Sequence, residues 1–137
     1  MKRKQFFGKK DSKKRKISEM VLGFSGDYVA MGENIEEKQE YLNGAVSAWN
    51  IACLDEEDRK RAIKKYMKEY GKLNPTHSKQ DLRDVEEDLR LLIKQKENLY
   101  PEVRVKIVNA HIQEIDGKDH VTVMSLRGGN RGRALIY

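Results

Sequence analysis

Apolar residues recur every three or four positions in four segments of the chain, which is the period of an amphipathic α-helix. The predicted helices cover residues 17–31, 35–54, 56–71 and 79–98. Residues that cap or stop helices separate these segments, and Gly32 is expected to close the first helix. The pattern therefore predicts a small helical core in the first hundred residues.

The segment 35–54 has the widest apolar surface of the four. Asn34 precedes it as an N-cap, and Glu37, three positions later, predicts a reciprocal capping box. Apolar residues cover more than half of its circumference, so it is expected to be the central helix of the core. Trp49 in this segment is expected to be inaccessible to solvent, and its truncation should cost several kcal/mol.

The other two long helices are expected to have narrower apolar faces. Asp55 caps the helix 56–71, and Ser78 with Asp81 predicts a capping box for the helix 79–98. Leu99 is expected on the buried face of the last helix. The opposite face of that helix alternates acids with bases, which is typical of a solvated surface.

After Pro101 the apolar period changes from 3.6 to 2, which predicts a β-hairpin over about 103–126 with its turn at Asp116-Gly117. Five residues are expected on the face that packs against the helices: Val108, Ala110, Ile112, Val121 and Val123. Val103, Val105 and Ile107 have the opposite parity, so a bulge near Ile107 and Val108 is required. Four helices followed by a hairpin define an α+β fold.

The two ends of the chain differ from the segment between them. Residues 1–16 hold too few apolar side chains to anchor on a core and are expected to form a disordered basic arm. Residues 127–137 form a Gly/Arg-rich tail that is predicted to be loop-like. The alternative for its last four residues, "ALIY", is a short edge strand. Residues 17–126 are expected to be a single globular domain.

The charge of the chain is concentrated in the arm. The 137 residues carry 28 Lys and Arg against 22 Asp and Glu, a net charge of +6. Residues 1–16 contain nine of those bases and one of the acids, so the remainder has 19 bases and 21 acids. A flexible cationic segment gains affinity for phosphates by releasing counterions, which indicates contact with nucleic acid or a ribonucleoprotein.

This contact is predicted to involve basic residues at both ends of the chain. They are Lys2, Arg3, Lys4, Lys9, Lys10, Lys13, Lys14, Arg15, Lys16, Arg127, Arg131 and Arg133. Phe6 and Phe7 could stack on unpaired bases. The alternative interpretation of both ends is a solubilising role, and the pattern selects neither DNA nor RNA and no base.

Two other classes of function stay open. In the first, the protein is an adaptor whose helical body binds a protein partner, and Tyr66 and Tyr70, one helical turn apart, form a contact patch unless they belong to the core. In the second it is an enzyme, although no phosphate-binding loop, nucleophile elbow or paired C-x-x-C is present. The sequence therefore predicts a binding protein rather than an enzyme and assigns no catalytic residue.

No cofactor or metal is predicted from the residue pattern. His111 and His120 share a strand face but lack further ligands, and the acids Asp81, Asp84, Glu87 and Asp88 have no partner histidine at a suitable spacing. Cys53 is expected to be a small buried hydrophobe. With no apolar run long enough for a bilayer, the chain is expected to be cytoplasmic and to make no membrane contact.

Overall fold

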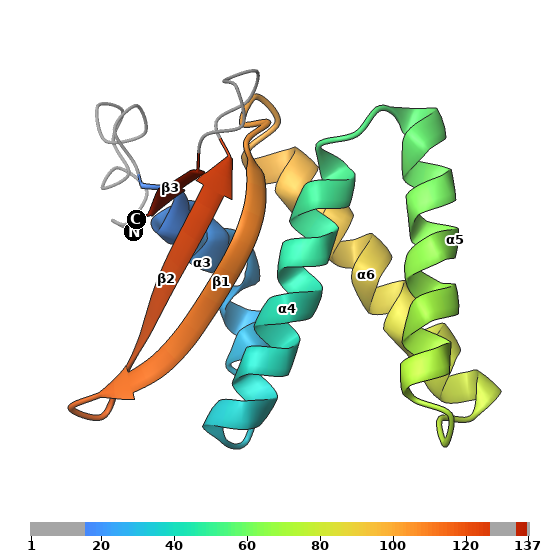
Figure 1. Cartoon of the computed structure of the whole chain (residues 1–137), viewed down its shortest axis with the longest axis horizontal. Coiled ribbons are helices and arrows are strands. Elements are labelled where there is room, and N and C mark those ends of the chain that lie inside the picture. Colours follow the sequence, from blue (N-terminus) through green and yellow to red (C-terminus); the bar gives the residue numbers. More distant parts are fainter. Residues whose placement is uncertain (1–15, 127–133, 137) are drawn as a thin grey trace.

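The computed structural model describes residues 16–126 and the backbone of residues 134–136 (Figure 1). Four helices are followed by an antiparallel hairpin, which confirms the predicted α+β fold. The helices are α3 (Ile17–Val29), α4 (Ile35–Ala52), α5 (Glu56–Leu73) and α6 (Lys79–Leu99). The hairpin consists of β1 (Lys106–Ile115) and β2 (Lys118–Leu126). Each helix begins at the predicted residue and ends within two residues of the expected position.

The helices form a layer on one face of the hairpin. α4 packs on β1 and α3 packs on β2, while α6 crosses behind α4 (Figure 1). α5 stands at the far side of α4. Among the described elements, its substantial contacts are with α4 and α6. α4 therefore occupies the centre of the fold, as its wide apolar surface predicts.

Trp49 lies at the middle of this core and is fully buried, which confirms the prediction for this residue. Its indole Nε1 donates a hydrogen bond to the Val105 carbonyl at 2.8 Å. The ring of Phe24 meets it edge-on with centroids 5.5 Å apart. The indole thus joins three elements of the chain: α3, α4 and the segment that leads into β1.

Two amide side chains of α4 bind the backbone of β1, which is an edge strand of the sheet. Asn50 donates to the Ile107 carbonyl and accepts from the Ile107 amide, each at 2.8 Å. Gln39 makes the equivalent pair with the Ala110 carbonyl and the Ile112 amide, at 3.0 and 2.9 Å. These bonds satisfy edge groups that could otherwise pair with another chain. The sequence pattern does not reveal this arrangement.

The required bulge is present in β1, where the register with β2 shifts between Ile107 and Asn109. Val108 is the extra residue and is 52% exposed, so its predicted inward position is wrong. The bulge changes the parity after Ile107, and this brings both Ile107 and the pair Ala110 and Ile112 onto the buried face. The predicted turn is confirmed by positive φ values of 54° at Asp116 and 75° at Gly117.

The capping predictions hold in part. Ser78 and Asp81 form the complete reciprocal box at the start of α6. Asn34 accepts from the Glu37 amide at 2.9 Å, but the Glu37 carboxylate accepts from the Glu33 amide instead of the Asn34 amide. The box predicted for α4 is therefore extended by one residue toward the preceding loop.

Gly32 does not cap α3, which ends three residues earlier with Ala30 as its C-cap. A Cβ atom on Gly32 would lie 2.7 Å from the Lys38 amide nitrogen. Glycine is needed here because the loop passes very close to the first turn of α4. Leu99 also departs from the prediction: it is 47% exposed because α6 ends at this residue.

Part of the tail predicted to be loop-like forms a strand. β3 (Ala134–Ile136) pairs antiparallel with β2 and completes the sheet in the order β1-β2-β3. The edge strand considered as the alternative for "ALIY" is therefore correct over these three residues. The rest of the tail and residues 1–15 of the predicted disordered arm, 1–16, lie outside the described residues.

Lys96 is fully buried among the core residues of α6. Its Nζ donates to the Val103 carbonyl and lies 5.0 Å from the centroid of the Trp49 ring. Burial lowers the pKa of its ammonium group. Cys53 is half-buried, with Sγ 3.9 Å from the Val103 carbonyl, and burial raises the pKa of its thiol. The raised pKa keeps the thiol protonated and unreactive at neutral pH.

None of the described helices is sufficiently long and apolar to cross a lipid bilayer.

Candidate functional site

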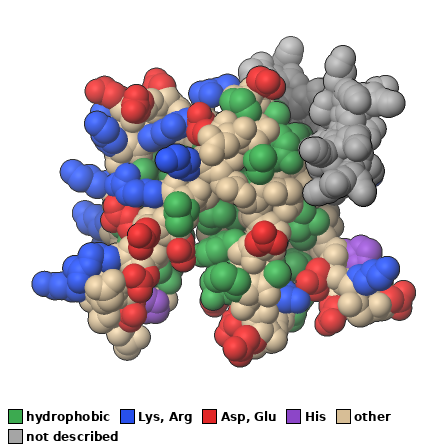
Figure 2. Space-filling view, turned by 180° about the vertical axis from the view of Figure 1, so that it is seen from behind, with side chains coloured by type: hydrophobic (Ala, Val, Ile, Leu, Met, Phe, Trp, Pro, Cys, Tyr) green, Lys and Arg blue, Asp and Glu red, His purple; other side chains and the backbone are tan. Residues whose placement is uncertain are grey.

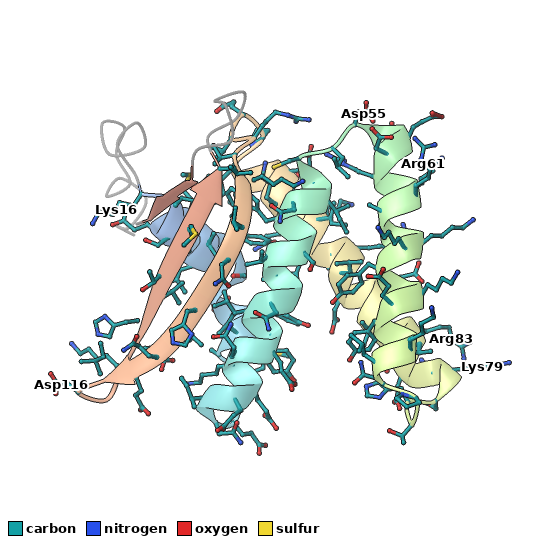
Figure 3. All side chains as sticks on the ribbon, viewed as in Figure 1. Lys16, Asp55, Arg61, Lys79, Arg83 and Asp116 are labelled. Carbon is teal, nitrogen blue, oxygen red and sulfur yellow. The ribbon has the colours of Figure 1, made fainter. Side chains whose placement is uncertain are left out.

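A cleft of about 720 Å³ opens between α4, α5 and α6. Its size falls within the usual range for ligand-binding sites. Figure 2 shows the molecule hollowed beside the column formed by α5 and the start of α6, and Figure 3 shows side chains entering the space between α4 and α5 from both helices. We call this space the tyrosine cleft, after the four residues that define it: Tyr28, Tyr41, Tyr66 and Tyr70.

The tyrosine cleft exists because α4 presents small and polar residues to α5. Gly44 and Ser47 both line its wall. A Cβ on Gly44 would lie 3.7 Å from the Tyr66 hydroxyl oxygen and 4.0 Å from the Tyr28 hydroxyl oxygen. The two hydroxyls thus approach the same point of α4 from different helices, and the absent side chain leaves the space between them open.

The four rings form two pairs on opposite walls. Tyr28 and Tyr41 meet edge to face, with centroids 4.9 Å apart and planes at 60°. Tyr66 and Tyr70 are stacked on α5, with centroids 6.1 Å apart and planes at 20°. Aromatic side chains supply large, rigid contact area and polar hydroxyl ends. The pairs therefore offer both ring faces and ring edges to a ligand.

The loop before α6 closes one end of the cleft. The Tyr70 hydroxyl and His77 Nε2 lie 3.3 Å apart. The Asn74 amide donates to the Tyr70 carbonyl at 2.9 Å. These contacts hold the ring of Tyr70 against the loop, so His77 fixes part of the cleft wall.

All charged side chains that line the cleft are acidic. They are Glu40, Glu69, Asp81, Asp84 and Asp88, and neither Lys nor Arg is among the lining residues. Burial, then the nearby Asp84 and Glu87 carboxylates, raise the pKa of Asp88. Hydrogen bonds with Ser78 lower the pKa of Asp81, which keeps it ionised. The cleft therefore has a strongly negative potential.

The same environment keeps the tyrosines neutral. Burial, followed by the Asp88 charge, raises the pKa of Tyr28. Burial also raises the pKa of Tyr66 and of Tyr70, with a smaller contribution from Glu40 for Tyr70. Neutral rings surrounded by carboxylates attract cations through the ring face and through the negative field.

A metal ion is a poor match for this arrangement. Within the described part of the chain, no group of three or more His, Cys, Asp and Glu side chains is arranged to hold one. The acidic residues of α6 line the cleft in sequence along one helix, and the histidine of the lining, His77, has its Nε2 3.3 Å from the Tyr70 hydroxyl. An organic cation such as a guanidinium or an ammonium group fits the lining better, since ring faces and separate carboxylates can share its charge.

The basic residues predicted to bind nucleic acid are almost all beyond reach of the structure. Lys16 is described and is exposed just before α3. The other eleven, in 2–15 and 127–133, lie outside the described residues.

Tyr66 and Tyr70 are half-buried and line the cleft, which combines the two interpretations given to them from the sequence. Tyr28, Tyr41 and Gly44 were not anticipated. The sequence indicates Tyr28 and Tyr41 only as members of the apolar stripes of two neighbouring helices, and it gives no signal for Gly44. His111 and His120 are exposed on the hairpin, where they face Thr122 and Gln113 in the register.

Comparison with known proteins gives no family from which a role could be transferred. No protein-family model matches the chain, and no significant similarity was found to a curated protein or to a solved structure. The functional argument consequently depends on the chemistry of the cleft and on the distribution of charge.

Proposed function

We propose that this chain is a non-enzymatic adaptor that binds a basic segment of a protein partner in the tyrosine cleft. The observation that carries this proposal is the composition of the lining: four tyrosines and five carboxylates, with no Lys or Arg. A basic side chain entering the cleft would meet no like charge among these lining residues. Tyrosine is also enriched among the residues that dominate the binding energy of protein interfaces.

The geometry suggests how such a segment is held. A guanidinium group stacks on the Tyr66 and Tyr70 pair, and its aliphatic stem covers the ring edges of Tyr28 and Tyr41. Neighbouring cations of the segment pair with rim carboxylates such as Glu69 and Asp84. The open side of Gly44 gives the stem room to enter.

The size of these effects decides the class of ligand. A cation over an aromatic ring contributes about 0.5–2 kcal/mol, and each exposed ion pair adds roughly 0–1 kcal/mol. A single basic amino acid would thus bind no more tightly than about millimolar. A segment with several Lys or Arg residues makes these contacts together, so a peptide is favoured over a free amino acid.

The test is binding of a labelled peptide of alternating arginine and serine, measured by fluorescence anisotropy. Gly44→Leu should weaken binding at least tenfold because the new side chain fills the cleft. Gly26→Leu is the matched control, since a Cβ on Gly26 has no heavy atom within 4 Å, and it should bind as the unaltered chain does. The double variant Glu69→Gln/Asp84→Asn tests the charge without changing side-chain volume and should weaken binding several-fold.

Replacing arginine by citrulline in the peptide removes the charge but keeps the shape, and it should abolish binding. Equal affinity of the Gly44→Leu variant and the unaltered chain would overturn the proposal, provided that both melt cooperatively. Equal affinity for the arginine and citrulline peptides would overturn the role of the negative field.

A second candidate function is contact with nucleic acid or a ribonucleoprotein through the basic ends of the chain. The concentration of nine basic residues in 1–16 supports it. Replacing these nine residues by Gln in the full chain should remove most of the salt-dependent binding. If five of them engage phosphates, log K should fall with log salt at a slope of roughly −4 to −5 on duplex. Undiminished binding by this variant would exclude the arm as the main contact.

A further inference from the structure

α5 carries a second charged surface on the side away from the tyrosine cleft. At 3.6 residues per turn, six basic residues fall within about 140° of its circumference. They are Lys60, Arg61, Lys64, Lys65, Lys68 and Lys72, and all six are exposed. Figure 2 shows Lys and Arg side chains gathered along the column that contains α5. We call this surface the lysine face.

Most of the lysine face is not neutralised by the protein. Arg61 forms an ion pair with Asp58 in the first turns of the helix. The five lysines take part in none of the ion pairs found among the described residues. Between residues 59 and 72 the only acid of α5 is Glu69, which lines the tyrosine cleft and stands at the border of the lysine face, about 40° from Lys65 around the helix.

The charge distribution differs from that of a helix that is merely solvated. The exposed side of α6 alternates acids and bases, as in the pair of Glu86 with Arg90 at 2.8 Å. Alternation gives solubility without a strong field, whereas a row of one sign along α5 creates a positive potential. The nearly neutral count of residues 17–137 hides this separation of charge.

A groove runs beside the lysine face on its α6 side. It has a volume of about 540 Å³, and its lining contains Lys60, Arg61 and Lys64 of α5, the apolar Ile63 and Met67, and the Glu86–Arg90 ion pair of α6. α5 packs against α4 and α6, so the backbone positions from which its lysines project are fixed before a ligand arrives. Preorganisation of this kind lowers the entropic cost of binding.

We propose that the lysine face binds the phosphate backbone of a nucleic-acid duplex. Lys60 and Lys72 are twelve residues apart, a rise of about 18 Å along the helix. One strand of a duplex carries a phosphate for about every 3.4 Å of axis, so the lysine face spans roughly five phosphates. This inference does not rest on the cleft or on the basic ends of the chain.

The choice of a duplex follows from the side chains that the lysine face lacks. Binding of single strands depends on aromatic side chains that stack on successive bases. The two tyrosines of α5, Tyr66 and Tyr70, line the cleft instead. A row of lysines without rings recognises the regular backbone of a duplex and reads no base sequence.

The test uses the full chain with Lys60→Gln/Lys64→Gln/Lys68→Gln and a labelled duplex of mixed sequence. Removing three phosphate contacts should reduce the magnitude of the salt slope by about 2.7 and weaken binding at low salt by at least tenfold. The matched control is Lys79→Gln/Lys106→Gln/Lys118→Gln, which removes the same charge from exposed positions elsewhere. Its slope should stay near that of the unaltered chain.

Melting curves of both triple variants confirm that each remains folded. An unchanged salt slope for the α5 variant would overturn the inference, and so would an equal loss in the two variants. Tighter binding of the same sequence as a single strand would also overturn it. If neutralising 1–16 alone removed all duplex binding, the second candidate function would stand and the lysine face would be excluded. Binding of the arginine peptide in the cleft is a separate readout that neither outcome changes.

Discussion

Val123→Asp should lower the free energy of unfolding by about 4 kcal/mol or more, because an uncompensated charge in a protein interior costs several kcal/mol. Val123 is fully buried on the face of β2 that packs against the helices, opposite Ala110 of β1. A domain at the lower end of the usual stability range of about 5–15 kcal/mol would be left only marginally stable by this change.

Thr122→Asp is the matched control, since it introduces the same side chain one residue away on the exposed face. Its effect should stay within about 0.5 kcal/mol, as is usual for surface substitutions. Urea unfolding followed by circular dichroism measures both variants. Similar losses in the two would show that the assignment of faces in the hairpin is wrong.

The parts of the fold that the sequence predicts are those determined by local chemistry. Asn34, Asp55 and Ser78 each accept a hydrogen bond from a backbone amide at the start of a helix. Such bonds depend only on residues within one turn, so the pattern of residues suffices to locate them. Asp116-Gly117 is similar, since its positive φ values are a local preference.

The phase of β1 shows where local reasoning fails. The pattern requires a bulge near Ile107 and Val108 but does not determine which of these residues leaves the core. Asn50 of α4 decides it, because it binds both backbone groups of Ile107 and holds that residue against the helix. Val108 is then the extra residue and is exposed. A contact between segments far apart in sequence thus selects between two locally equivalent registers.

Lys96 was not anticipated for a related reason. A lysine is normally assigned to the surface, and the residues around it give no indication otherwise. Its burial depends on a carbonyl acceptor at Val103 and on the ring of Trp49, which come from two other segments.

The tyrosine cleft depends on the separation of helices, which the sequence alone does not provide. The pattern indicates that Tyr66 and Tyr70 share a face of α5, but not that α4 opposes them with Gly44. It also gives a nearly neutral count for the body of the chain. The structure shows that α5 separates a negative cleft from a positive outer face, and both binding proposals rest on this separation.

Trp49→Ala should cost about 3–5 kcal/mol, the usual range when a buried aromatic side chain is removed from a core. Three losses contribute. The substitution leaves a cavity beside Phe24, it removes the donor to the Val105 carbonyl, and it takes away the ring beside the Lys96 ammonium. The buried Lys96 ammonium is less well stabilised once the indole ring is gone. The loss of unfolding free energy is therefore expected near the upper end of this range.

Trp49→Phe separates these contributions, because it keeps most of the ring and loses only the N–H donor and part of the volume. It should cost about 1–3 kcal/mol. Leu73→Ala, at a residue that is 80% exposed, is the control for truncation of a large side chain and should cost less than about 0.5 kcal/mol. Urea midpoints at an unchanged m-value, read by circular dichroism, give all three numbers. If Trp49→Ala cost no more than Leu73→Ala, Trp49 could not be the centre of the core, and the packing of α3, α4 and α6 around it would have to be different.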